Sequence, residues 1–536
     1  MFDPQQYPYP SQRQLVYSKR GMAATSHPLA SQAGIEAMQK GGNAIDAAIA
    51  AAACLTVVEP TSNGIGGDTF AMVWTKGRLY GLNSSGPAPQ QISIEALKAK
   101  GMEKMPVGGW EPVTVPGAPA AWAALSKRFG KLPFPTVLQP AADHARHGHP
   151  VAPTVARAWQ RTHEIYQKNE DKTLYEEWYR VFTCQGAIPQ AGDLWQSEDH
   201  ARTLEEIGAT HAESFYRGPL AEKIAKASAA GAGWLNRQDL AAFDPEWVEP
   251  ISADYKGYQV WELPPNGQGI VALAALNILQ EFQGLAKEDE LTIHRQIEAI
   301  KAAFSAGRQS IADPGWMEAG AVSELLSPSF AAKSASRIGD RARLPETGSL
   351  PNGGTVYLCT ADEEGNMVSL IQSNYYGFGS GIVVPDTGIA LQNRGFEFSL
   401  DPEHPNALAG GKRPYHTIMP GFLTRKGQPI GPFGMMGGYM QPQGHVQMLM
   451  NVIDFRLNPQ AALDAPRFQW LEGNKVEVEQ HFPRHLAQAL AARGHEVAVA
   501  LDSDSFGRGQ FIWKDRKSGV LAGATEPRCD GSIAVF

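Results

Sequence analysis

A glycine-rich turn that runs directly into a strand constrains this chain more than any other feature. The turn Asn352-Gly353-Gly354 leads into Thr355 and then into alternating apolar positions, Val356 and Leu358. Such alternation predicts a strand that begins at Thr355. Residues 362–366 form a second turn, and residues 367–373 read as the returning strand. The sequence therefore predicts a hairpin with a threonine at its start.

A threonine at that place can become a nucleophile only if the chain is cut before it. The hydroxyl of a threonine within the chain is weakly nucleophilic and has no base beside it. Cleavage of the Gly354–Thr355 bond would create an α-amine with a pKa of about 8 or below next to that hydroxyl. A threonine hydroxyl paired with its own amine is a known activated nucleophile. From Gly-Gly-Thr alone, however, a plain hairpin turn is the better interpretation.

Further motifs distributed along the chain decide between these two interpretations. They occur at Gly41–Ala48, Glu59–Asp68, Val115–Gly117, Asn374–Gly381, Lys412–Pro414, Gly437–Gly438 and Asp464–Arg467. With the hairpin at Thr355, these motifs resemble the γ-glutamyltranspeptidase family of N-terminal-nucleophile (Ntn) hydrolases. The resemblance spans nearly the whole chain, in the order typical of the family.

The resemblance implies an α+β fold, a four-layer αββα sandwich built from two segments. Residues 1–354 would form the large segment and residues 355–536 the small catalytic segment, separated by self-cleavage between Gly354 and Thr355. The two segments would remain together as a heterodimer in one intertwined globular unit. A small-molecule amide would be the substrate, and the resemblance implies no metal or organic cofactor.

The resemblance also assigns the catalytic residues. Thr355 corresponds to the nucleophile, with its own amine as the base. Ser373 stands where the family has a threonine whose hydroxyl bonds the nucleophile, and serine keeps that hydroxyl. Gly437 and Gly438 match the glycine pair whose backbone N–H groups stabilise the oxyanion, a large contribution to catalysis in such enzymes.

The substrate pocket departs from the family pattern. Residues 83–89 lack the arginine that grips the α-carboxylate of a γ-glutamyl group, and the stretch between Phe398 and Lys412 is too short for the lid loop of many relatives. The two positions that hold the substrate amino group carry Arg394 and Glu397. The family's paired serines are replaced in the run Tyr415, His416 and Thr417. We therefore expect Arg394, Glu397, His416 and Thr417 to contact the substrate.

Two roles for Arg394 remain open from the sequence. It can form a structural ion pair with Glu397, or it can bind a substrate carboxylate with its guanidinium fork. By resemblance the default substrate is glutathione or another γ-glutamyl compound, with transfer of the acyl group to water or an amine. The alternative is hydrolysis of another small anionic acyl amide, of the oxamate or glutaryl type. An uncleaved, non-catalytic binding protein is the third hypothesis, and the retained catalytic residues argue against it.

Composition excludes several other classes. A net charge of −8 and a pI near 6.0 argue against a nucleic-acid partner. No run of 18 apolar residues predicts a membrane span, and the first ten residues lack the pattern of a secretory signal. The four cysteines are far apart, which is typical of free thiols in a reducing compartment. We therefore expect a cytoplasmic enzyme.

Helices and strands are expected in different parts of the chain. Before Thr355 the pattern is mainly helical, after it mainly β with one long helix at 442–454. Residues 316–354 are expected to form a surface loop. Helices are predicted at 32–40, 43–57, 118–129, 136–147, 153–169, 203–207, 218–230, 269–282 and 292–309. Such segregation favours layers of helices over stacked sheets.

Overall fold

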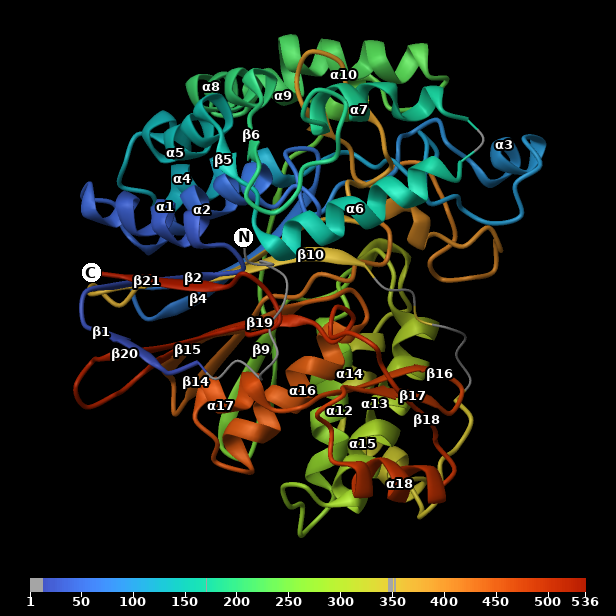
Figure 1. Cartoon of the computed structure of the whole chain (residues 1–536). Helices are drawn as coiled ribbons and strands as arrows, with labels where there is room; N and C mark the ends of the chain where they lie inside the picture. Colours follow the sequence, from blue (N-terminus) through green and yellow to red (C-terminus); the bar gives the residue numbers. More distant parts are fainter. Residues whose placement is uncertain (1–12, 170, 346–349, 351–352) are drawn as a thin grey trace.

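The computed structural model describes residues 13–169, 171–345, 350 and 353–536. Two seven-stranded sheets lie face to face, with one group of helices above the pair and a second group below it (Figure 1). Three buried clusters of apolar side chains fill the spaces between these four layers. The predicted α+β fold class and the αββα sandwich are confirmed.

The predicted hairpin forms the centre of the first sheet. Its strands β10 and β11 pair antiparallel, and a β-bulge interrupts the register between Gly354 and Val356. Every residue of β11 is buried, because helices cover one face of this sheet and the second sheet covers the other. In spatial order the strands are β21 (Ser532–Val535), β2 (Gly21–Thr25), β10 (Gly354–Asp362), β11 (Met367–Tyr375), β3 (Asp68–Thr75), β4 (Arg78–Ser84) and β7 (Glu246–Val248).

The second sheet also mixes strands from both sides of Thr355. It brings β15 against β10, and this close approach depends on Gly434: a Cβ there would lie 2.4 Å from the ring of Tyr357. In spatial order its strands are β1 (Val16–Ser18), β20 (Leu521–Thr525), β19 (Arg508–Lys514), β15 (Gln428–Met436), β14 (Gly421–Arg425), β9 (Tyr258–Glu262) and β8 (Ile251–Tyr255). Smaller sheets join β16 (Phe468–Glu472), β17 (Lys475–Val478) and β18 (Glu496–Val499), β12 (Val383–Val384) with β13 (Ile389–Ala390), and β5 (His149–Pro150) with β6 (Leu194–Trp195).

The alanine-rich helix α2 (Ala44–Val58) lies against the first sheet and is buried along its whole length. Asn43, whose place before the alanine-rich run predicts an N-cap, caps the helix, and the structure adds a capping box through the side chain of Asp46. The other helices of this layer are α1 (Pro28–Gln39), α3 (Ile94–Ala99), α4 (Ala118–Phe129), α5 (Phe134–His147), α6 (Pro153–Gln167), α7 (Glu176–Phe182), α8 (Glu198–Thr210), α9 (Glu213–Arg217), α10 (Pro219–Ala230) and α11 (Arg237–Ala241).

The helices below the second sheet correct one expectation. The predicted surface loop at 316–354 contains two helices, and Leu325, Ala331 and Ala335 on them are buried in the core. Ser327 caps the second of these helices by accepting from the Phe330 N–H. These apolar patterns are too short to reveal a helix by period alone. The layer comprises α12 (Gly269–Gln280), α13 (Glu290–Ser310), α14 (Ala321–Leu325), α15 (Pro328–Ser336), α16 (Met440–Ile453), α17 (Pro459–Asp464) and α18 (Arg484–Ala492).

Chain segments from both sides of Thr355 contribute to both large sheets and to the helical layer below the second sheet, whereas helices α1 to α11 of the upper layer all precede it (Figure 1). The parts before and after this residue therefore share their cores and do not form separate domains. Among the described residues, no helix is long and apolar enough to cross a membrane. Of the predicted cleavage turn, positions 351 and 352 lie outside the described residues.

Candidate active site

Thr355 lies at the start of β10, buried between the two sheets. Its hydroxyl donates to the Gly354 carbonyl oxygen at 2.6 Å and lies 3.2 Å from the hydroxyl of Ser373 on β11. Ser373 Oγ also donates to the Gly354 carbonyl oxygen, at 2.7 Å. In the uncut chain the hydroxyl thus sits beside the carbonyl it would attack, and a second hydroxyl polarises that carbonyl. The predicted Gly354, Thr355 and Ser373 are brought together.

Arg394 is completely buried beside this pair, on the short 3-10 helix Arg394–Glu397. One guanidinium nitrogen donates to Thr417 Oγ1 at 2.6 Å and the other to Ser373 Oγ at 3.1 Å. The guanidinium carbon lies 4.1 Å from the ring centre of Tyr375. Burial lowers the pKa of Arg394. Within the described part of the chain no carboxylate approaches the guanidinium to 4.0 Å, so the direct ion pair with Glu397 is not formed.

Glu397 is held instead by two tyrosines. The Tyr375 hydroxyl donates to one carboxylate oxygen, and the Tyr439 hydroxyl donates to the other at 2.6 Å. Burial raises the pKa of both phenols well above their ordinary value, so both keep the protons that they donate. Both oxygens of Glu397 therefore have a donor before any substrate binds. Neither tyrosine was singled out from the sequence.

His416 and Thr417 point to different partners. Thr417 bonds Arg394, whereas His416 lies 3.0 Å from Asp68 Oδ2 through its Nε2. The backbone N–H of Ile418 donates to His416 Nδ1, so Nε2 carries the ring proton. Both ring nitrogens are thus engaged within the protein, and His416 positions the pocket wall rather than offering a free group to a ligand.

Asp68 is the buried acid that sequence reasoning missed. Its Oδ1 accepts from the N–H groups of Gly86 and Gly117 and from Gln392 Nε2 at 2.8 Å. Burial nevertheless raises its pKa to about 7, against the lowering effect of Arg394 and these donors. The available signal was an acidic residue directly after the glycine-rich turn at 64–67 and directly before a strand.

The titration of Asp68 predicts a pH-dependent difference in stability. The folded pKa near 7 lies above the unfolded value of about 3.9, so the folded chain binds the extra proton between these values. This contribution is present at low pH and is lost as the pH rises through 7. The free energy of unfolding of Asp68→Asn, relative to that of the unchanged protein, should therefore increase from pH 5 to pH 8, by on the order of a few kcal/mol.

Thermal unfolding at the two pH values measures this shift. Comparing variant and unchanged protein at each pH removes the titration of all other groups. The exposed Glu318 supplies the control: Glu318→Gln should show the same Tm difference at both pH values. A Tm difference for Asp68→Asn that does not change with pH would refute the raised pKa.

Gly437 and Gly438 form the turn between β15 and α16, with φ of 132° and 56°. Such positive φ angles favour glycine. Among the described residues, neither backbone N–H has an acceptor. The carbonyl of Gly438 accepts from Gln268 Nε2 at 2.9 Å, which holds the turn in place. Two backbone N–H groups without an acceptor among the described residues, at a turn that follows Thr355 in the chain, are what an oxyanion site requires.

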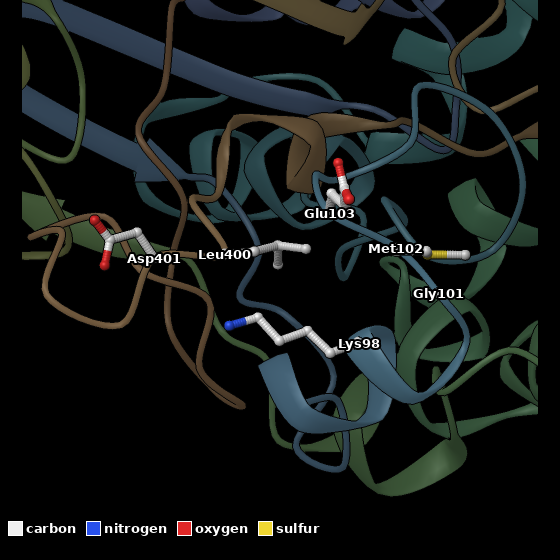
Figure 2. A pocket seen from close by; sticks show the side chains of 6 residues that line it. All are labelled: Lys98, Gly101, Met102, Glu103, Leu400 and Asp401. Carbon is white, nitrogen blue, oxygen red and sulfur yellow. The ribbon is translucent and has the colours of Figure 1, made fainter.

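A surface hollow lies apart from these residues, between α3 and the loop that follows Glu397 (Figure 2). The loop contributes Leu400, whose side chain lies between those of Lys98 and Glu103 in Figure 2, and Asp401, whose carboxylate points away from them. None of the predicted catalytic residues lines it. Its lining residues are Lys98, Gly101, Met102, Glu103, Leu400 and Asp401.

Comparisons with known proteins agree with this geometry. The family model described as gamma-glutamyltranspeptidase matches residues 30–536. The glutathione hydrolase-like YwrD proenzyme of Bacillus subtilis is 35% identical, covering 96% of this chain and 98% of its own length. The oxamate amidohydrolase proenzyme of Klebsiella pneumoniae is 34% identical, covering 97% and 99%. The crystal structure of cephalosporin acylase from Bacillus halodurans superposes with a TM-score of 0.97 at 56% identity, covering 100% and 99%.

Proposed function

The chain belongs to the γ-glutamyltranspeptidase family of Ntn hydrolases. On this premise we propose that it cleaves itself and then hydrolyses small anionic acyl amides, with Thr355 as the nucleophile. Members of this family are enzymes made as proenzymes. We place the cut between Gly354 and Thr355, which leaves segments 1–354 and 355–536 as a heterodimer. The shared sheets would hold the two segments together after the cut.

Maturation uses only groups of the chain itself and water. The Thr355 hydroxyl oxygen attacks the Gly354 carbonyl carbon, and the peptide C–N bond breaks as the ester C–O bond forms. The proton of the hydroxyl passes to the departing nitrogen. Ser373 Oγ, 2.7 Å from the carbonyl oxygen, stabilises the negative charge that develops on it. Water then hydrolyses the ester, which frees the carboxyl group of Gly354 and the hydroxyl and amine of Thr355.

In turnover the same hydroxyl attacks the substrate amide. The new α-amine of Thr355 accepts the hydroxyl proton and passes it to the leaving amine. The acyl group is carried as an ester on Thr355 until water or another amine takes it. The N–H groups of Gly437 and Gly438 supply the oxyanion donors in this proposal.

One observation carries the substrate class: the buried Arg394 guanidinium beside Ser373 has no carboxylate partner in the described chain. An unpaired buried charge is costly by several kcal/mol, and an anionic acyl group would supply the missing partner. Among the described residues two phenols already occupy Glu397, so this acid does not require a substrate α-amine as its partner. The relative named as an oxamate amidohydrolase supports an acyl group without that amine, because oxamate has none.

Hydrolysis or transfer of γ-glutamyl groups, including that of glutathione, is the second candidate. Glu397 stands at the family's position for an acid that holds the substrate amino group, and a 35% identical relative is named glutathione hydrolase-like. A substrate ammonium could bind Glu397 if Tyr375 or Tyr439 turned away from it. The two candidates therefore differ in one testable group, the α-amine.

A matched set of substrates separates the candidates. γ-Glutamyl-p-nitroanilide and glutaryl-p-nitroanilide differ only in the α-amine, and pentanoyl-p-nitroanilide replaces the glutaryl carboxylate by a methyl group. Oxamate, followed by ammonia release, tests a carboxylate attached directly to the amide carbonyl. We expect the mature protein to hydrolyse glutaryl-p-nitroanilide or oxamate at least about 10-fold faster, in kcat/KM, than either of the other two.

Other outcomes reassign the function. A higher kcat/KM for the γ-glutamyl substrate would establish the second candidate. Preference for the pentanoyl substrate would refute an anion-binding pocket. A protein that is cut at Thr355 but hydrolyses none of the four substrates would refute the proposed substrate class.

A further inference from the structure

We propose that Arg308 is a specificity-determining residue that binds the carboxylate at the far end of a longer acyl group. This inference rests on the proposed function and names its substrates more closely. The enzyme would then take monoamides of dicarboxylic acids whose carboxylate is separated from the amide by several methylene groups. Arg308 lies in the last turn of α13, on the large segment.

The Arg308 guanidinium is held by two tyrosines. One nitrogen donates to the Tyr439 hydroxyl. The guanidinium carbon lies 5.2 Å from the ring centre of Tyr439 and 5.8 Å from that of Tyr415, whose rings stack at 5.8 Å. No carboxylate of the described residues lies within 4.0 Å of it, and the side chain is only partly buried. The guanidinium is thus oriented by two rings, on a side chain that is not fully buried.

Tyr439 connects Arg308 to the active site. It directly follows Gly438 of the predicted oxyanion pair. Its hydroxyl donates to Glu397 at 2.6 Å and therefore accepts from Arg308. Arg308 is separated from the reacting centre by this one side chain.

The local charge leaves room for a further anion. Glu397 lies between two arginines, reaching Arg308 through Tyr439 and Arg394 through Tyr375. Two guanidinium groups share Glu397, and the other buried acid, Asp68, acts on Arg394 and not on Arg308, so a positive excess remains at Arg308. An acyl carboxylate bound at Arg308 would offset that excess in a partly desolvated place.

The two arginines would bind substrate carboxylates that lie at different distances from the amide. Arg394 bonds Ser373, which itself bonds the carbonyl at the cleavage site, so its fork lies next to the acyl carbonyl. A carboxylate attached to that carbonyl, as in oxamate, would reach Arg394. Arg308 lies beyond Tyr439 and would meet the carboxylate of a longer chain such as glutaryl.

The test compares the kcat/KM of the Arg308→Gln variant with that of the unchanged protein on three substrates. Arg308→Gln should lower kcat/KM for glutaryl-p-nitroanilide by roughly 10- to 100-fold, mainly through KM, the range for a lost charge-assisted bond. Oxamate and pentanoyl-p-nitroanilide should change by less than about 3-fold. Arg308→Lys, which keeps the charge but not the fork, should fall between. Arg295 lies on the same helix with its guanidinium over Phe282, and Arg295→Gln should change nothing.

The controls separate this inference from a structural role and from the proposed function. Cleavage into two bands is verified first; if Arg308→Gln is not cut, Arg308→Lys is measured in its place. Equal losses on all three substrates would make Arg308 a support for Tyr439 and overturn the inference. Unchanged protein that hydrolyses oxamate but not the glutaryl amide would overturn the inference alone. Mature protein that hydrolyses neither anionic amide would overturn the proposed function itself.

Discussion

Thr355→Ala should run as one band of 57.9 kDa on a denaturing gel, whereas the unchanged protein should separate into a larger and a smaller band. The hydroxyl that lies 2.6 Å from the Gly354 carbonyl oxygen is the only group proposed to attack that bond. Its removal also removes the nucleophile of turnover. Amide hydrolysis should therefore fall on the order of 10³-fold or more, as is typical for loss of a nucleophile.

Two variants control for this result. Thr355→Ser keeps a hydroxyl and should still be cut. Cys359→Ala should be cut normally, because Cys359 is buried between the sheets and burial raises the pKa of its thiol. Two bands from Thr355→Ala would show that a contaminating protease or another group of the chain makes the cut, and the maturation proposal would fail.

Arg394→Gln should lower kcat/KM for oxamate by about 10²-fold, the order expected for loss of a charge-assisted hydrogen bond of roughly 3 kcal/mol. The buried guanidinium has hydroxyl partners but no described carboxylate within 4.0 Å, so a bound anion would be its first charged partner. The neutral pentanoyl amide should lose much less. Cleavage at Thr355 should persist, because the bond from Ser373 to the Gly354 carbonyl does not require the guanidinium.

Arg394→Lys should give an intermediate loss, since a lysine keeps the charge but cannot form the fork. Arg425→Gln, an exposed arginine stacked on Tyr258, serves as the matched control and should leave both rates unchanged. If Arg394→Gln matures normally and hydrolyses oxamate and the pentanoyl amide with unchanged relative rates, Arg394 is structural and the anion pocket is wrong.

Patterns within a single segment could be read from the sequence. The hairpin around Thr355 follows from two turns and two short apolar runs. Helix α2 follows from a long alanine-rich run with Asn43 as its cap, and α4 begins and ends where its period predicts. Each of these elements is specified by neighbours within about 15 residues, which is why periodicity suffices. The cytoplasmic location stays a prediction.

Elements that depend on distant partners could not be read in this way. Strands β19, β20 and β21 near the C-terminus were missed. β19 pairs with β15 and β20, and β21 pairs with β2, so two of these pairings join strands that are far apart in the sequence. Helices α14 and α15 were missed because they have few apolar residues, and the burial of these residues depends on packing against a core formed by other segments. Burial by other segments overrode a weak local signal.

For the active site, the sequence by itself determined the family, through short motifs and their order along the chain, and by that resemblance it predicted Gly354, Thr355, Ser373, Gly437 and Gly438 as the catalytic positions. Only the tertiary structure decided the pocket. It occupies both oxygens of Glu397 with phenols, gives Arg394 hydroxyl partners in place of a carboxylate, and binds His416 to Asp68. Those contacts join residues that lie from 22 to 348 positions apart. Hydrogen bonds across such separations are set by how the two sheets and their loops pack, which no local pattern records.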